Sequence, residues 1–162
     1  YWENDIKKWK YSGLALVDEV NSLRPRAVLD VGCGYNEFKG KIDNLIGIDP
    51  YNDKADIQVS TLEYRTTQKF DVMLCLGSVN FGSRDKIISE VGRCVDLLED
   101  GGTMFFRVNP GVQHNKPEAK WIEFFAWNVP FIIELSEIFN LKVLDIRDDS
   151  NQRKYFIYRK VK

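Results

Sequence analysis

The stretch that decides the fold is 28–38, which reads Val-Leu-Asp-Val-Gly-Cys-Gly-Tyr-Asn-Glu-Phe. A short apolar run ends here in an acid and a glycine-rich turn. A second run, 45–50, reads Leu-Ile-Gly-Ile-Asp-Pro and also ends in an acid. Because glycine has no Cβ, such a turn lets a ligand approach the main chain closely. A strand, a glycine turn and an acid at the tip of the next strand together predict a nucleoside-binding site in an α/β protein.

The glycine turn resembles the first motif of the class I S-adenosylmethionine-dependent methyltransferases, an acid followed by Gly-x-Gly-x-Gly. The acid is Asp30, and the first two glycines are Gly32 and Gly34. Asn36 replaces the third glycine, and asparagine readily adopts the left-handed backbone conformation, so we expect the turn to be kept. A nicotinamide-binding turn would need glycine at Glu37, and a glutamate facing a pyrophosphate is electrostatically unfavourable.

Apolar runs alternate with helical patterns along the chain, which predicts a parallel sheet built of strand–helix units. The resemblance covers 28–108, where the motifs follow one another in the order of the family. It implies a single Rossmann-like, doubly wound α/β sheet of seven strands in the order 3-2-1-4-5-7-6. Helices would cover both faces, and the last two strands would form an antiparallel hairpin. The expected strands are 27–31, 45–49, 57–59, 70–76, 103–108, 141–146 and 155–158.

Each expected helix begins near a residue that caps or opens a first turn. Pro25 ends the first helix. The glycine pair 101–102 is expected to cap the end of the helix that begins at Ser83. Only ten residues separate Gly34 from Leu45 at the start of the second strand, so a helix between them is very short. The starting residues of the other helices are Ser12, Ser83, Pro117 and Pro130.

The whole chain, 1–162, is expected to form one methyltransferase-like domain, because its length leaves little room for a separate substrate domain. Residues 1–24 form an N-terminal helical segment in this interpretation. Residues 1–11 hold aromatic side chains among lysines. Two roles stay open for them, a lid over the cofactor or simple packing on the flank of the sheet.

The resemblance implies S-adenosylmethionine as the cofactor and S-adenosylhomocysteine as the product, bound at the carboxyl ends of strands one and four. Asp30 would anchor the turn or the methionine amine. Asp49 would accept hydrogen bonds from both ribose hydroxyls, with a plain strand-end cap as the alternative. Tyr51 would flank the adenine or be a turn aromatic. The full predicted cofactor-binding set is Asp30, Gly32, Cys33, Gly34, Asn36, Asp49, Pro50, Tyr51, Ser60, Thr61, Leu62, Leu76 and Gly77.

The methyl acceptor is constrained mainly by motifs that the sequence lacks. Enzymes that methylate amino groups of DNA bases carry Asp/Asn-Pro-Pro-Tyr/Phe after strand four, where a flipped-out base is held. Residues 76–79 read Leu-Gly-Ser-Val instead, and the Pro-Cys nucleophile of cytosine-C5 enzymes is also missing there. We therefore expect a small-molecule or sugar-like acceptor, and nucleic acid is not indicated. His114 is the candidate catalytic base, and Asn80 and Asn109 are candidate substrate contacts.

Two other functions stay open at this level. A catalytically silent, methyltransferase-like binding protein or partner subunit is the main alternative, since no clear catalytic group stands out. A nicotinamide oxidoreductase is the third, and Glu37 disfavours it. The atom that is methylated and the oligomeric state are not specified by the sequence.

Composition gives no indication of a membrane, nucleic-acid or metal partner. The net charge is −1, so no general attraction to polyanions is expected. No apolar run approaches the roughly 20 residues of a membrane helix. The three cysteines, Cys33, Cys75 and Cys94, lack metal-binding spacing and predict reduced thiols. These features favour a cytoplasmic enzyme without a metal.

Overall fold

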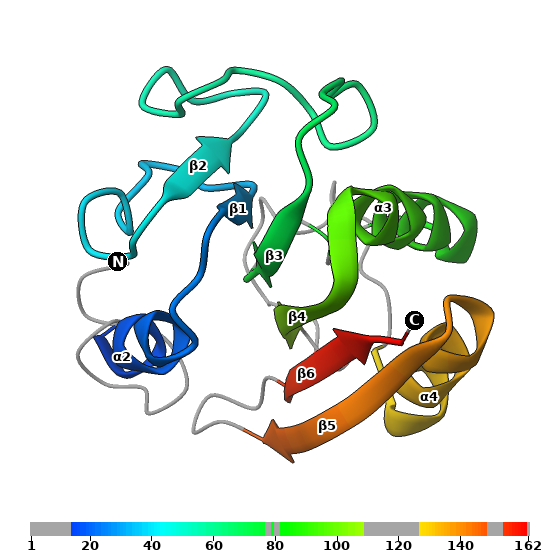
Figure 1. Cartoon of the computed structure of the whole chain (residues 1–162). Coiled ribbons are helices and arrows are strands. Elements are labelled where there is room, and N and C mark those ends of the chain that lie inside the picture. Colours follow the sequence, from blue (N-terminus) through cyan, green and yellow to red (C-terminus); the bar gives the residue numbers. More distant parts are fainter. Residues whose placement is uncertain (1–13, 77–78, 80–81, 109–126, 149–153, 162) are drawn as a thin grey trace.

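The computed structural model of the chain describes residues 14–76, 79, 82–108, 127–148 and 154–161 (Figure 1). Helices and strands alternate through these residues, as expected for an α/β fold. The helices are α2 (Leu14–Ser22), α3 (Arg84–Leu97) and α4 (Val129–Ile138). The strands are β1 (Val28–Val31), β2 (Leu45–Ile48), β3 (Phe70–Cys75), β4 (Leu98–Val108), β5 (Leu141–Asp148) and β6 (Lys154–Lys160).

The strands form one mixed sheet in the order β2-β1-β3-β4-β6-β5. The first four strands of the chain pair in parallel, and β6 lies antiparallel between β4 and β5. The predicted strand order and the predicted C-terminal hairpin are therefore confirmed for these six strands. The strand order reverses between β1 and β3, and this topological switch point is where a doubly wound sheet binds its ligand.

The predicted count of seven strands is wrong for the described part of the chain, which forms six. The missing one is 57–59, where only an isolated bridge joins Ile57 to Ile48. Ile57 is 40% exposed, so this short segment buries too little apolar surface to extend the pairing. It still follows the edge of β2 for one residue, because the N–H of Asp49 donates to the carbonyl of Ile57 over 3.3 Å.

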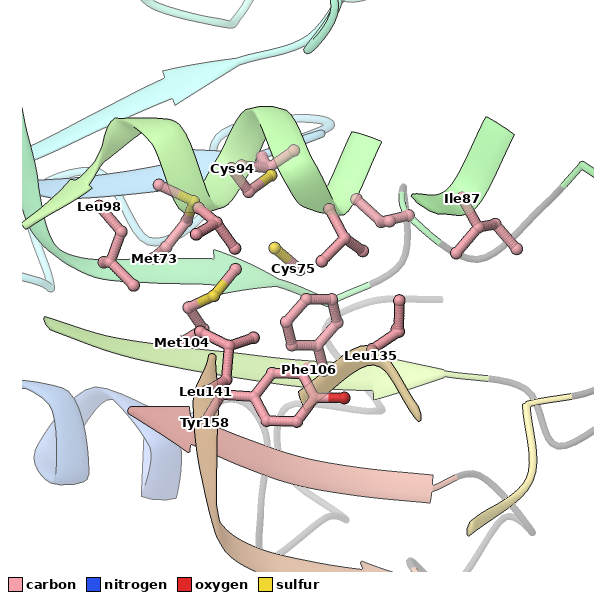
Figure 2. Packing of buried hydrophobic residues seen from close by; sticks show 14 of the residues in the cluster. Met73, Cys75, Ile87, Cys94, Leu98, Met104, Phe106, Leu135, Leu141 and Tyr158 are labelled. Carbon is pink, nitrogen blue, oxygen red and sulfur yellow. The ribbon is translucent and has the colours of Figure 1, made fainter. Parts of the chain in front are cut away.

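The sheet has an apolar core on each face, because side chains alternate along its buried strands. Val72 and Leu74 of β3 belong to the core beneath α2. Met73 and Cys75 of the same strand belong to the core beneath α3 and α4. Figure 2 shows Met73 and Cys75 facing Cys94 of α3 across this second core. Helices thus cover both faces of the sheet, as predicted (Figure 1).

The end of α3 differs from the prediction. Ser83 caps its first turn as expected, accepting a hydrogen bond from the N–H of Lys86 over 3.2 Å. The helix then passes directly into β4 at Leu98, so the glycine pair 101–102 lies inside the strand and caps no helix. Leu98 pairs with Phe70 of β3, so the strand begins ahead of the glycine pair. Leu98 is completely buried, and its side chain occupies the space that a Cβ on Gly102 would need.

The connection from β1 to β2 also differs, because it consists of turns and holds no helix among residues 32–44. Gly32, Gly34, Asn36 and Gly40 have φ values of 70°, 56°, 61° and 83°, and so many left-handed residues prevent a helix from forming. The expected left-handed conformation of Asn36 is confirmed. Helix α4 begins as predicted beside Pro130, with the Asn128 side chain capping its first turn. The predicted helix near residue 117 and the segment 1–13 lie outside the described residues.

Candidate nucleoside-binding site

A cleft of about 480 Å³ opens at the carboxyl ends of β1 and β2. This is the edge of the sheet at which the sequence predicted cofactor binding. Three segments form the walls: the glycine turn, the loop that leaves β2, and the first half of α3. The lining residues are Gly32, Asp49, Pro50, Tyr51, Val59, Ser60, Thr61, Leu62, Lys86 and Glu90.

Asp49 joins the two walls that come from β1 and β2. Its Oδ2 accepts a hydrogen bond from the N–H of Gly34 over 3.0 Å, and its Oδ1 accepts one from the N–H of Tyr51 over 2.8 Å. An ionised carboxylate has about four lone-pair positions, so these two bonds leave acceptor capacity for a ligand in the cleft. Asp49 therefore caps the end of β2 and also lines the cleft, and its contact with a ribose stays a prediction.

Asp30 lies beneath the glycine turn and is 4% exposed. Burial, and next the charge of nearby Asp49, raise the pKa of Asp30 from 3.8 to about 7. No described lysine or arginine forms an ion pair with either carboxylate. Two close carboxylates favour a cationic ligand group, because a positive charge would relieve both their repulsion and the desolvation of Asp30.

Asn36 shapes the turn from the side away from the cleft. Its Nδ2 donates to the carbonyl of Lys54 over 3.1 Å and to Asp56 Oδ2 over 3.3 Å. The same Asp56 oxygen accepts the N–H of Gly47 over 2.8 Å and lies 3.2 Å from the ammonium of Lys39. We call these four residues, Asn36, Lys39, Gly47 and Asp56, the Asp56 node. Burial alone would raise the pKa of Asp56, but the Gly47 N–H, Lys39 and Asn36 together hold it below its ordinary value.

The glycine turn packs directly on β2 at Gly47. A Cβ at Gly47 would come within 2.3 Å of Asn36 Oδ1 and 2.8 Å of Cys33 Sγ, so only glycine allows this contact. Cys33 thus packs against the strand. Burial, followed by the charges of Asp30 and Asp49, raises the pKa of the Cys33 thiol to about 12, which keeps it neutral and unreactive.

The loop after β2 forms the outer rim of the cleft. Tyr51 is 93% exposed, whereas Thr61 is buried at 9% exposure. The hydroxyl of Ser60 donates to Glu63 Oε1 over 2.8 Å and accepts the N–H of Glu63 over 3.3 Å, which fixes the turn at 60–63. This turn presents Thr61 and Leu62 to the cleft.

Helix α3 contributes two lining residues that the sequence did not single out, Lys86 and Glu90. They lie one helical turn apart, and Lys86 Nζ is 3.7 Å from Glu90 Oε1. Burial raises the pKa of Glu90, and the charge of Lys86 offsets part of this rise. The sequence offered one signal for Glu90 as a site residue: it is a carboxylate on the otherwise apolar inner face of α3.

The structure brings together much of the predicted cofactor set. Asp49, Tyr51 and the other cleft residues line the cavity, and Asp30, Cys33, Gly34 and Asn36 support it from behind. The side chain of Leu76 is buried in the core beneath α2, and the predicted contact of its backbone carbonyl with the methionine amine stays a prediction. The remaining predicted residues, Gly77, Asn80, Asn109 and His114, lie outside the described residues.

The described residues contain no group of three or more histidine, cysteine, aspartate or glutamate side chains that could hold a metal ion. None of the helices described is long and apolar enough to cross a membrane.

Comparison with solved structures shows that the chain has the fold of the class I S-adenosylmethionine-dependent methyltransferases. The N-methyltransferase NodS from Bradyrhizobium japonicum WM9 matches 91% of this chain with 93% of its own, at a TM-score of 0.66 and 14% identity. A 1,6-didemethyltoxoflavin-N1-methyltransferase from Burkholderia thailandensis, crystallised with 1,6-didemethyltoxoflavin and S-adenosylhomocysteine, matches 90% with 76%, at a TM-score of 0.70 and 15% identity.

The magnesium protoporphyrin IX methyltransferase from Synechocystis PCC 6803, crystallised with S-adenosylmethionine, matches 90% of this chain with 76% of its own. The TM-score is 0.69 and the identity 10%. No model of a known protein family and no curated protein matches the sequence. At these identities the likeness shows the fold alone.

Proposed function

We propose that this chain is an S-adenosylmethionine-dependent methyltransferase that acts on a small molecule. The proposal rests on one observation, the position of Asp49. Its carboxylate lies in the cleft at the tip of β2 and at the same time holds the glycine turn after β1. A nucleoside ribose offers two adjacent hydroxyl donors, and an ionised carboxylate is an acceptor that suits both.

The other residues of the site fit the rest of the cofactor. The methionine part of S-adenosylmethionine carries an ammonium and a sulfonium, and no phosphate. The pair Asp30 and Asp49 favours positive charge, whereas a dinucleotide pyrophosphate would meet these acids and Glu37 unfavourably. This charge pattern supports S-adenosylmethionine over a nicotinamide cofactor.

When bound, the cofactor supplies an activated methyl group on a cationic sulfur. The chain's own contribution is binding and alignment. Asp49 orients the ribose, Gly32 and Gly34 give main-chain access, and the rim at 50–62 shields the base from water. His114 stays the proposed base for an acceptor that must lose a proton, with Asn80 and Asn109 as proposed substrate contacts.

The acceptor is proposed as a small molecule on two grounds. The sequence lacks the motifs of DNA-base methyltransferases after β3. Two of the solved structures with this fold are named for small acceptors, 1,6-didemethyltoxoflavin and magnesium protoporphyrin IX. We propose further that residues 1–162 act as one domain, since the described elements share a single sheet.

Calorimetric titration with S-adenosylhomocysteine tests the cofactor assignment. We expect binding with a Kd of about 1–100 μM, a rise in Tm, and no comparable effect from NAD. Turnover is then measured as release of S-adenosylhomocysteine from S-adenosylmethionine with pooled small-molecule acceptors, using Asp49→Ala as the inactive control. No heat and no thermal shift at millimolar S-adenosylhomocysteine would refute the proposal.

A further inference from the structure

The cleft contains a pair of opposite charges on α3 that the ribose and methionine contacts do not use. Glu90 is only 8% exposed, while the side chain of Lys86 remains 55% exposed. Carboxylates are seldom buried so far unless they are paired or hydrogen-bonded. The distance of 3.7 Å between Lys86 Nζ and Glu90 Oε1 is longer than a charge-assisted hydrogen bond. Lys86 alone therefore leaves much of the hydrogen-bond acceptor capacity of the Glu90 carboxylate unused.

The proposed function limits which part of the cofactor can reach this pair. If Asp49 holds the ribose and Asp30 beneath the glycine turn attracts the methionine cation, the base must occupy the remaining part of the cleft. That part is bounded by residues 59–62 and by α3. Ser60 is already engaged with Glu63. Among the described residues that line the cleft, Glu90 is the one carboxylate besides Asp49.

We propose that Glu90 and Lys86 determine the specificity of the site for adenine. Glu90 accepts a hydrogen bond from the exocyclic amino group, and Lys86 donates one to a ring nitrogen beside it. This rests on the proposed function, because it takes the bound nucleoside to be that of S-adenosylmethionine.

The chemistry of the two side chains matches the base. Adenine presents an amino donor next to a ring-nitrogen acceptor. An ionised carboxylate only accepts and an ammonium only donates, so the pair is complementary to this edge. A base with a carbonyl oxygen in place of the amino group would place an acceptor against the buried carboxylate of Glu90. A site built to bind a donor rejects an analogue that lacks it.

The test compares S-adenosylhomocysteine with its deaminated analogue S-inosylhomocysteine, in which a carbonyl replaces the amino group. Both are titrated calorimetrically into the full chain and into three variants. Glu90→Gln gives a side chain that can also donate. Lys86→Gln removes the ammonium from an exposed side chain, where little effect on folding is expected. Asp96→Asn is the matched control, because Asp96 is an exposed acid on the same helix and outside the cleft.

The unaltered chain should bind S-adenosylhomocysteine about tenfold or more tightly than the analogue. Glu90→Gln and Lys86→Gln should each reduce this preference to about threefold or less, and Asp96→Asn should keep it. Melting curves confirm that each variant is folded.

The outcomes separate the two proposals. Equal affinities of the unaltered chain for the two ligands, or a preference unchanged in Lys86→Gln and in folded Glu90→Gln, would overturn the role of the pair and leave the proposed function in place. Failure of the unaltered chain to bind S-adenosylhomocysteine at all would overturn both.

Discussion

The main-chain N–H of Gly34 donates a hydrogen bond to Asp49 Oδ2 over 3.0 Å, which ties the glycine turn after β1 to the tip of β2. The other oxygen of the carboxylate holds the N–H of Tyr51. One side chain therefore fixes two of the three walls of the cleft before a ligand enters. Such preorganisation lowers the entropy cost of binding.

Replacing Asp49 with alanine should weaken S-adenosylhomocysteine binding by about 2–4 kcal/mol, because two ribose hydroxyls and two main-chain donors lose a charged acceptor. The affinity of Asp49→Asn for S-adenosylhomocysteine should fall between those of the unaltered chain and Asp49→Ala, since the amide keeps one acceptor oxygen. Titration calorimetry gives the affinities. Asp53→Ala, an exposed acid in the neighbouring turn, is the control and should bind like the unaltered chain. If Asp49→Ala also binds like it, the ribose role is wrong.

Asp30 should make the free energy of unfolding fall as pH rises. Its pKa is about 7 in the folded chain against 3.8 ordinarily, so between these values the folded state keeps a proton that the unfolded state has lost. Stability then decreases with pH in this window and levels off above it. Between about pH 5.5 and pH 7 the loss is up to about 2 kcal/mol.

Asp30→Asn should remove this part of the pH dependence, because the amide does not titrate. Denaturant unfolding at several pH values, run on both chains, isolates the contribution of Asp30 from that of other groups. Parallel stability curves for the two chains would show that Asp30 does not titrate in this window.

Gly47→Ala should strain the glycine turn where it packs against β2, at the Asp56 node. The new methyl would meet Asn36 Oδ1 and Cys33 Sγ, and overpacking of this kind costs about 1–3 kcal/mol of stability. Asn36→Gly removes the nearer atom. The double variant should therefore lose less free energy of unfolding than the sum of the losses in the two single variants. Thermal or denaturant unfolding measures all three. Strict additivity would mean that the turn and β2 do not touch as described.

Asp71→Ala should lower stability while leaving the cleft intact. The Asp71 carboxylate accepts the N–H of Arg26 at 3.1 and 2.9 Å and the N–H of Ala27 at 2.9 Å, which fastens the start of β1 to β3. Loss of these bonds is expected to cost about 1–3 kcal/mol. Affinity for S-adenosylhomocysteine should stay within twofold or so of the unaltered chain. A large loss of affinity in this variant would show that the two ends of β1 are coupled.

The strand order was implied by the resemblance to the methyltransferase family and is confirmed for six strands. Local patterns in the sequence were sufficient for the six strands themselves, for the turn at Gly32 to Asn36, and for the acid at Asp49. Each depends on neighbours within one strand–turn unit: apolar runs favour buried strands, and glycine or asparagine allows positive φ. Strand 57–59 was wrongly predicted, because a local pattern does not show where in the sheet a segment lies. Its residues suit a strand, but its place at the sheet edge leaves Ile57 exposed.

Contacts between distant segments were decided only by the tertiary structure. Asp56 reaches Asn36 twenty positions away, and no local pattern marks this contact. Glu90 comes to the cleft of Asp49 from another element, and its place on the apolar face of α3 does not show which residues it meets. The raised pKa of Asp30 likewise depends on burial from all sides and on the charge of Asp49. Sequence patterns therefore determined the strands and the acid at the tip of β2. Folding alone decided which other charges meet there, because burial and distance are properties of the packed chain.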